Sequence, residues 1–189
     1  MRRFHQILLI VSVLVASWMG MQAVHEFGHV LGAWITGGKV SKVVWHPLTI
    51  SRTDLSYNPR PLLVVWAGPV VGILLPLASW GLAVALRGPG AFVNRFFAGF
   101  CLIANGAYIA FGSFDGIGDC GTMLRHGSPI WSLWLFGAVT MPIGLWLWHR
   151  QGEHFGLGAA KGQVSRGAAY RCLAASILLV VIALTLGGE

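Results

Sequence analysis

Five long apolar runs constrain the fold of this chain more than any other feature of its sequence. They lie at residues 7–35, 62–86, 92–112, 130–148 and about 172–186. A helix needs about 20 predominantly apolar residues to cross the hydrocarbon core of a bilayer, and four of these runs reach or approach that length. Apolar residues make up 56% of the chain and charged residues only 10%, against about 45–50% and about 25% in soluble domains. We therefore expect an α-helical, multi-pass integral membrane protein with about five transmembrane helices.

The segment that follows the first run predicts a different local structure. The first run is too long for the apolar region of a signal peptide, so we expect an uncleaved spanning helix that ends at Gly37 and Gly38. Residues 39–61 are polar, with several β-branched residues and with proline and Asn-Pro as punctuation. This composition favours a short β-hairpin directly after the first helix.

The chain shows no linker and no internal repeat that would divide it. We expect a single membrane-embedded domain over residues 1–189, with a core at about 7–128 and additional helices at 130–148 and 172–186. An irregular break, rich in glycine and containing two aspartates, follows the third run at residues 112–129.

The basic residues carry information about topology. The formal net charge is +7, but the thirteen lysines and arginines are spread through loops and chain ends. Because they form no basic stripe, the sequence argues against a nucleic-acid partner and favours contacts with the lipid bilayer. A cytoplasmic N-terminus puts eight of the thirteen in cytoplasmic segments, an excess that favours this orientation. The eight are Arg2, Arg3, Arg87, Arg95, Arg150, Lys161, Arg166 and Arg171. We expect the plasma membrane as the location.

The first apolar run contains two histidines and a glutamate in the sequence HEFGH, which fits the pattern H-E-x-x-H. On a helix, His25 and His29 lie one turn apart on one face, so their imidazoles can bind one zinc ion. Zinc lowers the pKa of its water to about 7. Glu26, beside the first histidine, can then act as the general base on that water.

The alternative is that these three residues are polar groups with partners in a packed core. A five-residue pattern with three fixed positions also occurs by chance. However, ionisable side chains within a spanning helix are costly and rare, and they mark functional sites. Three of them on adjacent faces of one helix therefore favour a metal site.

A catalytic zinc site takes three protein ligands and keeps one open position, so a third ligand is expected elsewhere. Asp115 and Asp119 both lie in the break after the third run. Irregular backbone at membrane depth is tolerated where it lines a protein-enclosed cavity, which makes this break a natural partner of HEFGH. Cys120 and His126 are weaker candidates, and a solvated Gly-Asp turn is the alternative for the aspartate that is not a ligand.

Four segments follow one another in an informative order: HEFGH, ITGGKV, WAGPVVG and IANGAYIAFGSFDGIGDCGTML. This ordered set resembles the site-2 protease family of intramembrane zinc metalloproteases. ITGGKV is similar to the end of the family's zinc helix and its first β-strand, and WAGPVVG to the Ala-Gly-Pro start of its second core helix. The last segment resembles the family's Asn-containing helix and its Leu-Asp-Gly zinc loop. The resemblance covers residues 11–124 and fits the minimal core form of the family.

The resemblance implies one zinc ion held by His25, His29 and an aspartate, with Glu26 as the base. It also implies that Asn105 orients the substrate or stabilises the oxyanion, with an interhelical hydrogen bond as the alternative role.

The third-ligand loop diverges from the family, because the family's segment is rich in Asn-Pro and this one has no proline. Asp115 matches the family's tripeptide better. Asp119 better matches the way the family's loop leads into an apolar helix, and we favour Asp119.

The sequence thus predicts a zinc metalloendopeptidase that hydrolyses a peptide bond in or near a transmembrane segment of a membrane-protein substrate. The first alternative is an inactive protease-like scaffold or regulatory binding protein, although such a protein would not need Glu26. The second is a zinc transporter component, but none of the other apolar runs holds an acid or a histidine well inside it. Nothing in the sequence specifies an oligomeric state.

Overall fold

The computed structural model describes residues 2–48 and 50–186 and is mainly helical. Within these residues, five helices are long and apolar enough to cross a membrane. They are α1 (Arg2–Thr36), α2 (Pro61–Ala85), α3 (Ala91–Asp115), α5 (Ile130–Trp148) and α6 (Arg166–Leu186). The shorter elements are β1 (Lys39–Val44), β2 (Arg52–Tyr57), α4 (Gly118–Arg125) and two 3-10 helices, η1 (Gly152–Phe155) and η2 (Gly158–Ala160). The predicted fold class, a helical membrane protein with a hairpin after the first helix, is confirmed.

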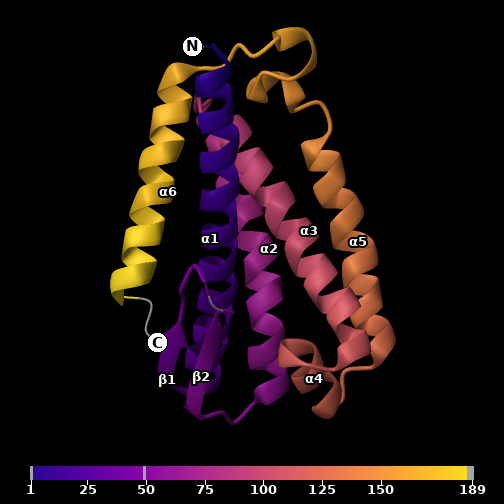
Figure 1. Cartoon of the computed structure of the whole chain (residues 1–189). Helices are drawn as coiled ribbons and strands as arrows, with labels where there is room; N and C mark the ends of the chain where they lie inside the picture. The colour runs from indigo at the N-terminus through magenta and orange to yellow at the C-terminus, as the bar shows by residue number, and fades with distance from the viewer. Residues whose placement is uncertain (1, 49, 187–189) are drawn as a thin grey trace.

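The long helices lie side by side in one bundle (Figure 1). α2 packs along α1, α3 along α2 and α5 along α3, while α6 also packs along α1. The N-terminus and the segment with η1 and η2 lie at one end of the bundle, and the hairpin and α4 lie at the opposite end. The segments that follow the first and the third long helices, far apart in the sequence, therefore reach the same end of the molecule.

Glycines bring α1 and α2 into close contact. A Cβ atom on Gly28 would lie 2.8 Å from the Cα atom of Gly68, and one on Gly32 would lie 2.7 Å from the Cβ atom of Ala67. Small residues four apart let helix backbones approach closely within a membrane. The HEFGH segment, which contains Gly28, is therefore held directly against the first half of α2.

A second glycine contact fixes α3 against α5. Gly99 and Gly106 on α3 face Gly144 and Gly137 on α5, so the two helices are antiparallel with a spacing of two turns between contacts. A Cβ atom on Gly144 would lie 2.7 Å from the carbonyl oxygen of Gly99, and one on Gly137 would lie 2.8 Å from that of Gly106. This close packing sets the position of α3, which carries the chain towards α4.

The hairpin begins where α1 ends, as predicted. Gly37 has a φ of +77°, and the backbone N–H of Gly38 donates to the carbonyl of Ala33 at 2.7 Å, which ends the helix. The strands β1 and β2 then pair in antiparallel fashion. The indole of Trp45, just after β1, donates from Nε1 to the carbonyl of Met19 at 3.1 Å. This bond fixes the hairpin to the side of α1.

The last helix begins at Arg166, six residues before the predicted start at 172. Ser165 starts it, because its Oγ atom accepts a hydrogen bond from the backbone N–H of Ala168 at 3.2 Å. Ala168 and Ala169 are buried in a cluster with Leu9 of α1. An apolar run could not reveal this first part of the helix, because two arginines and three small residues make up most of it.

The α3–α5 contact predicts a steric effect on stability. Gly137→Leu should lower the thermal midpoint of the protein in detergent, since overpacking costs about 1–3 kcal/mol. Gly81→Leu is the matched control, because Gly81 also lies inside a helix but a Cβ atom there would meet nothing within 4 Å. A midpoint of Gly137→Leu at or above that of the wild type would contradict the packing described here.

Candidate metal centre

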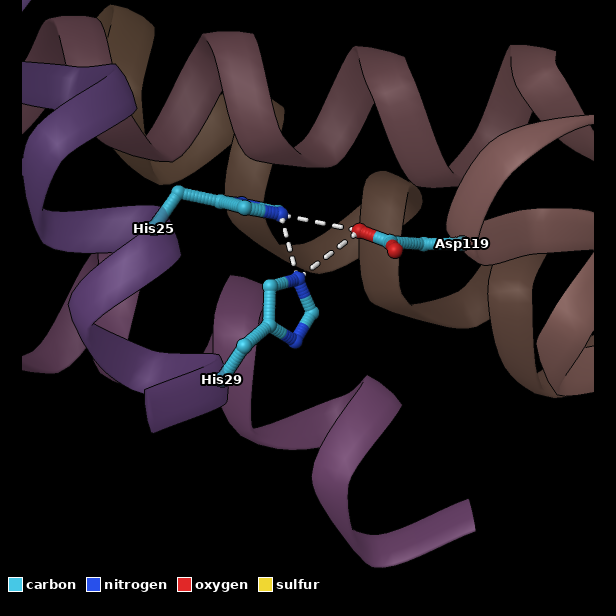
Figure 2. A group of neighbouring side chains, drawn as sticks. All are labelled: His25, His29 and Asp119. Atoms are coloured by element: carbon cyan, nitrogen blue, oxygen red, sulfur yellow. Dashed lines mark hydrogen bonds and ion pairs between the residues drawn. The ribbon is translucent and has the colours of Figure 1, made fainter. Parts of the chain in front are cut away.

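Three potential metal ligands converge from α1 and α4 (Figure 2). His25 and His29 lie one helical turn apart, and their Nε2 atoms are 3.1 Å from each other. The Oδ2 atom of Asp119, in the first turn of α4, lies 2.8 Å from Nε2 of His25 and 3.3 Å from Nε2 of His29. The three ligand atoms all lie within 4.8 Å of one another, so this group could hold a metal ion.

The partner of His25 sets which ring nitrogen carries its proton. Nδ1 of His25 lies 2.7 Å from Oδ1 of Asn105. The amide of Asn105 is oriented by its own Nδ2 group, which donates to the carbonyl of Cys101 at 2.9 Å. Because Oδ1 only accepts hydrogen bonds, Nδ1 of His25 must donate. In the neutral imidazole, the lone pair is therefore on Nε2, which faces Asp119.

The same reasoning applies to His29. Its Nδ1 atom lies 2.9 Å from the carbonyl oxygen of Val64, which can only accept. Both histidines thus direct the Nε2 lone pair at one point, where a carboxylate oxygen also lies. Two lone pairs at this separation repel unless a proton or a cation lies between them. Two neutral imidazoles and a carboxylate, with the second nitrogen of each histidine bonded to protein, fit a divalent metal such as zinc.

The charge state of Asp119 suits metal binding. Burial by itself raises the pKa of this carboxyl group, but its interactions with His25 and His29 outweigh burial and hold the pKa well below the usual range. Asp119 is therefore ionised at neutral pH. An ionised carboxylate is the form that coordinates a cation.

The other candidates in the same break lie outside the metal-ligand group. Asp115 is the last residue of α3 and its side chain is exposed. Gly116, with a φ of +62°, then turns the chain so that Asp119 enters the first turn of α4. Burial and the nearby carboxylate raise the pKa of Cys120 to about 11, so it is a thiol at neutral pH. His126 follows the other end of α4 and is exposed. The geometry favours Asp119 as the third ligand.

The base predicted from the motif is buried beside the hairpin. Glu26 is only 4% exposed, and its Oε2 atom accepts a hydrogen bond from the hydroxyl of Thr53 in β2 at 2.8 Å. Thr53 therefore fixes the carboxylate of Glu26 on the side of the hairpin. Nothing in the local sequence around Thr53 distinguishes it, so sequence reasoning could not have found this contact.

Two glycines of α2 make room for the side chains of this centre. A Cβ atom on Gly68 would overlap the imidazole ring of His29, and one on Gly72 would lie 3.0 Å from Oδ1 of Asn105. Both belong to the segment WAGPVVG. This segment is thus adapted in shape to the residues that position the potential ligands.

Asn105 forms an interhelical hydrogen bond, which is the alternative role considered from the sequence. It is 1% exposed, and both ends of its amide bond to protein, one to His25 and one to the carbonyl of Cys101. A direct role towards substrate or oxyanion stays a prediction that none of these contacts supports.

Tyr108 is a further residue of this centre that sequence reasoning missed. Its hydroxyl accepts a hydrogen bond from the backbone N–H of Asp119 at 3.1 Å, and its ring centroid lies 5.9 Å from that of His25. A Cβ atom on Gly118 would overlap this hydroxyl. Tyr108 lies one helical turn after Asn105, and this spacing is the signal that could have placed it on the same face.

The potential ligands therefore come from α1 and α4, and each of these residues is held by a contact with α2 or α3.

No protein-family model, curated protein or solved structure matches this chain at a significant level.

The two aspartates should differ in their effect on metal content. We expect Asp119→Asn to lose most of the zinc bound by the wild-type protein, because it removes a charged ligand. Asp115→Asn should bind as much zinc as the wild type, since its side chain is exposed and outside the group. Both expectations are tested by measuring the moles of zinc per mole of purified protein by elemental mass spectrometry. Full zinc in Asp119→Asn would refute its assignment as a ligand.

The bond between Asn105 and His25 should also affect metal affinity. Asn105→Leu is expected to weaken zinc binding by about 10- to 100-fold, the usual effect of removing a group that orients a metal-ligating histidine. Asn94→Leu is the control, because Asn94 lies on the same helix and bonds to the carbonyl of Gly90. Competition with a chelator of known affinity gives the zinc dissociation constants of the two variants. Equal constants would show that the bond between Asn105 and His25 is irrelevant to zinc binding.

Proposed function

We propose that this protein is a zinc-dependent intramembrane endopeptidase of the site-2 protease type. The observation that carries the proposal is the group formed by the buried His25 and His29 and the half-buried Asp119, with the buried carboxylate of Glu26 directly after His25 in the chain. His25 lies eleven residues before the end of α1, which is about 16 Å along a helix axis. That depth is comparable with half of a hydrocarbon core of about 30 Å.

The chain supplies three protein ligands, the number typical of a catalytic zinc site that keeps one position open. Zinc bound there would act as a Lewis acid and would lower the pKa of a coordinated water to about 7. Asn105 and the carbonyl of Val64 orient the two imidazoles for this purpose.

Glu26 is the residue to which we assign proton transfer. Thr53 holds its Oε2 atom, which leaves Oε1 for the attacking water. The carboxylate takes the proton of that water and delivers it to the amine that leaves. The burial of Glu26 keeps bulk solvent away from this exchange.

The substrate class follows from the surroundings of the centre. The histidines and their partners lie on α1, α2 and α3, which are apolar enough to span a membrane. We therefore infer that the peptide bond to be cleaved belongs to a transmembrane segment or its immediate flank. That segment must be unwound before a peptide bond can reach the ligands. The described sheet has only two strands, which leaves an edge of each unpaired. A substrate strand added to β2 would pass beside Glu26, because Thr53 lies on β2.

We also infer the orientation of the protein from its basic residues and propose a location. The end of the bundle that carries the N-terminus is taken as cytoplasmic. The plasma membrane is the location that we propose.

The test of the proposed function separates binding of zinc from catalysis. Glu26→Gln should retain zinc, while cleavage of a panel of transmembrane substrates in detergent or liposomes should fall about 100- to 10,000-fold. Glu153→Gln, which changes an exposed acid in η1, is the matched control and should cleave as the wild type does.

Cleavage by Glu26→Gln at the wild-type rate would refute the assignment of the base. Zinc bound by a wild-type protein that cleaves no member of the panel would favour the alternative, a protease-like scaffold or regulatory protein.

A further inference from the structure

A cleft lies at the end of the bundle opposite the hairpin. Its volume is about 370 Å³, and it lies between the end of α2, the start of α3 and η1. Figure 1 shows these three ends together beside the N-terminus. One wall of the cleft is apolar and contains Trp80, Val84 and Phe92. The polar residues that line the cleft include Arg95, Gln151 and His154. The cleft thus combines an apolar wall with polar groups at the level where spanning helices begin and end.

Arg95 brings a positive charge to this cleft without an acidic partner. One of its terminal nitrogens, Nη2, donates to the carbonyl of His149 at 3.2 Å. Its Nε–H group is buried and has no hydrogen-bond partner among the described residues. Within the same part of the chain, no carboxylate lies at ion-pair distance from Arg95. A buried guanidinium donor of this kind is suited to a phosphate oxygen.

Gln151 adds an acceptor that also lacks a partner. Its side chain is 3% exposed, and its Nε2 group donates to the carbonyl of Leu147 at 2.9 Å. Its Oε1 atom is buried and has no donor among the described residues. A buried acceptor without a donor costs about 1–3 kcal/mol. Of the four buried side-chain atoms without a partner in residues 2–48 and 50–186, two belong to residues that line this cleft.

His154 contributes a third polar group in a fixed position. Its ring stacks on Phe92, with centroids 4.9 Å apart and planes at 19°. The surrounding segments are basic, since Arg87, Arg150 and Lys161 lie in the loops at this end and Glu153 is the acid among them. An anionic group would be attracted to this end of the molecule.

We propose that this cleft binds a phosphate ester that also carries a hydrogen-bond donor, as the headgroup of phosphatidylethanolamine or phosphatidylglycerol does. Arg95 binds the phosphate, and Gln151 Oε1 accepts a hydrogen bond from the ammonium or hydroxyl group. The apolar wall contacts the glycerol and the start of the acyl chains. Because Nε and Oε1 are shielded from solvent, the headgroup reaches them with a change of side-chain rotamers, which binding commonly brings. The site is separate from the metal centre and does not depend on the proposed protease activity.

The test uses the full-length protein in detergent with soluble short-chain forms of phosphatidylethanolamine, phosphatidylglycerol and phosphatidylcholine, and with inorganic phosphate. Binding is measured by native mass spectrometry. We expect Arg95→Gln to bind the first two lipids about tenfold more weakly, as the loss of a charge-assisted hydrogen bond predicts. Arg171→Gln is the matched control, because it removes the same charge at the same end from the exposed face of α6. It should bind as the wild type does.

A second variant tests the acceptor. Gln151→Met should weaken binding of phosphatidylethanolamine and phosphatidylglycerol but not of phosphatidylcholine, whose choline group has no hydrogen-bond donor. Equal effects on all three lipids would overturn the role of Gln151. If Arg95→Gln does not fold, Arg95→Lys keeps the charge without the planar guanidinium and should still bind more weakly.

Two results would overturn the proposal as a whole. Lipid binding that is the same in the wild type and in folded Arg95 variants would mean that Arg95 only anchors α3 at the membrane surface. Arg95-dependent binding of inorganic phosphate that is as tight as that of the lipids would assign the cleft to a soluble phosphate and exclude the lipid.

Discussion

The hydrogen bond between Asn105 and His25 is the interaction on which the arrangement of the candidate metal centre depends. It joins α3 to α1 in the interior of the bundle and fixes the proton of His25 on Nδ1. A satisfied hydrogen bond is strong in surroundings of low polarity, and an unsatisfied one is correspondingly unfavourable. Gly72 leaves room for this bond, because a Cβ atom there would lie only 3.0 Å from Oδ1 of Asn105. The contact of α3 with α5 holds the helix in the position from which Asn105 reaches His25.

The polar groups of the centre are tolerated at this depth because each has a partner on another element. His29 bonds to the backbone of α2, and Glu26 bonds to Thr53 of β2. The backbone N–H of Asp119 bonds to Tyr108 of α3. Small residues in α1 and α2 provide the space in which these partners meet. Polarity and close packing are therefore linked here, since an ionisable group inside a membrane protein needs both a partner and room to reach it.

Much of the fold could be predicted because apolar length reports directly on membrane-spanning helices. The run at 130–148 matches α5 at both ends, and Gly37 and Gly38 end α1 where expected. The start of α6 could not be found in this way, because it depends on Ser165 and on small residues that pack against Leu9. The proximity of His25 and His29 could also be predicted, because residues four apart lie on the same face of a helix.

The third potential ligand was harder to predict, because it depends on where α3 stops. A helix that continued past Asp115 would have carried Asp119 in another direction, and the left-handed turn at Gly116 brings Asp119 into α4, where it faces α1. Thr53 and the carbonyl of Val64 are contacts between segments far apart in sequence, and no local pattern marks them. Tyr108 could have been found from its spacing, since it follows Asn105 by one turn.

His25 and Asp119 are separated by 94 positions in the sequence, which has a consequence during synthesis of the chain. Chains are made from the N-terminus, so α1 is synthesised before Val64, Asn105 and Asp119. During that interval its histidines and glutamate have none of their later partners. The many apolar residues of this 35-residue helix must then outweigh the three ionisable residues of its HEFGH segment. The length of this apolar helix therefore allows His25, Glu26 and His29 to be accommodated before the segments that carry their partners have been synthesised.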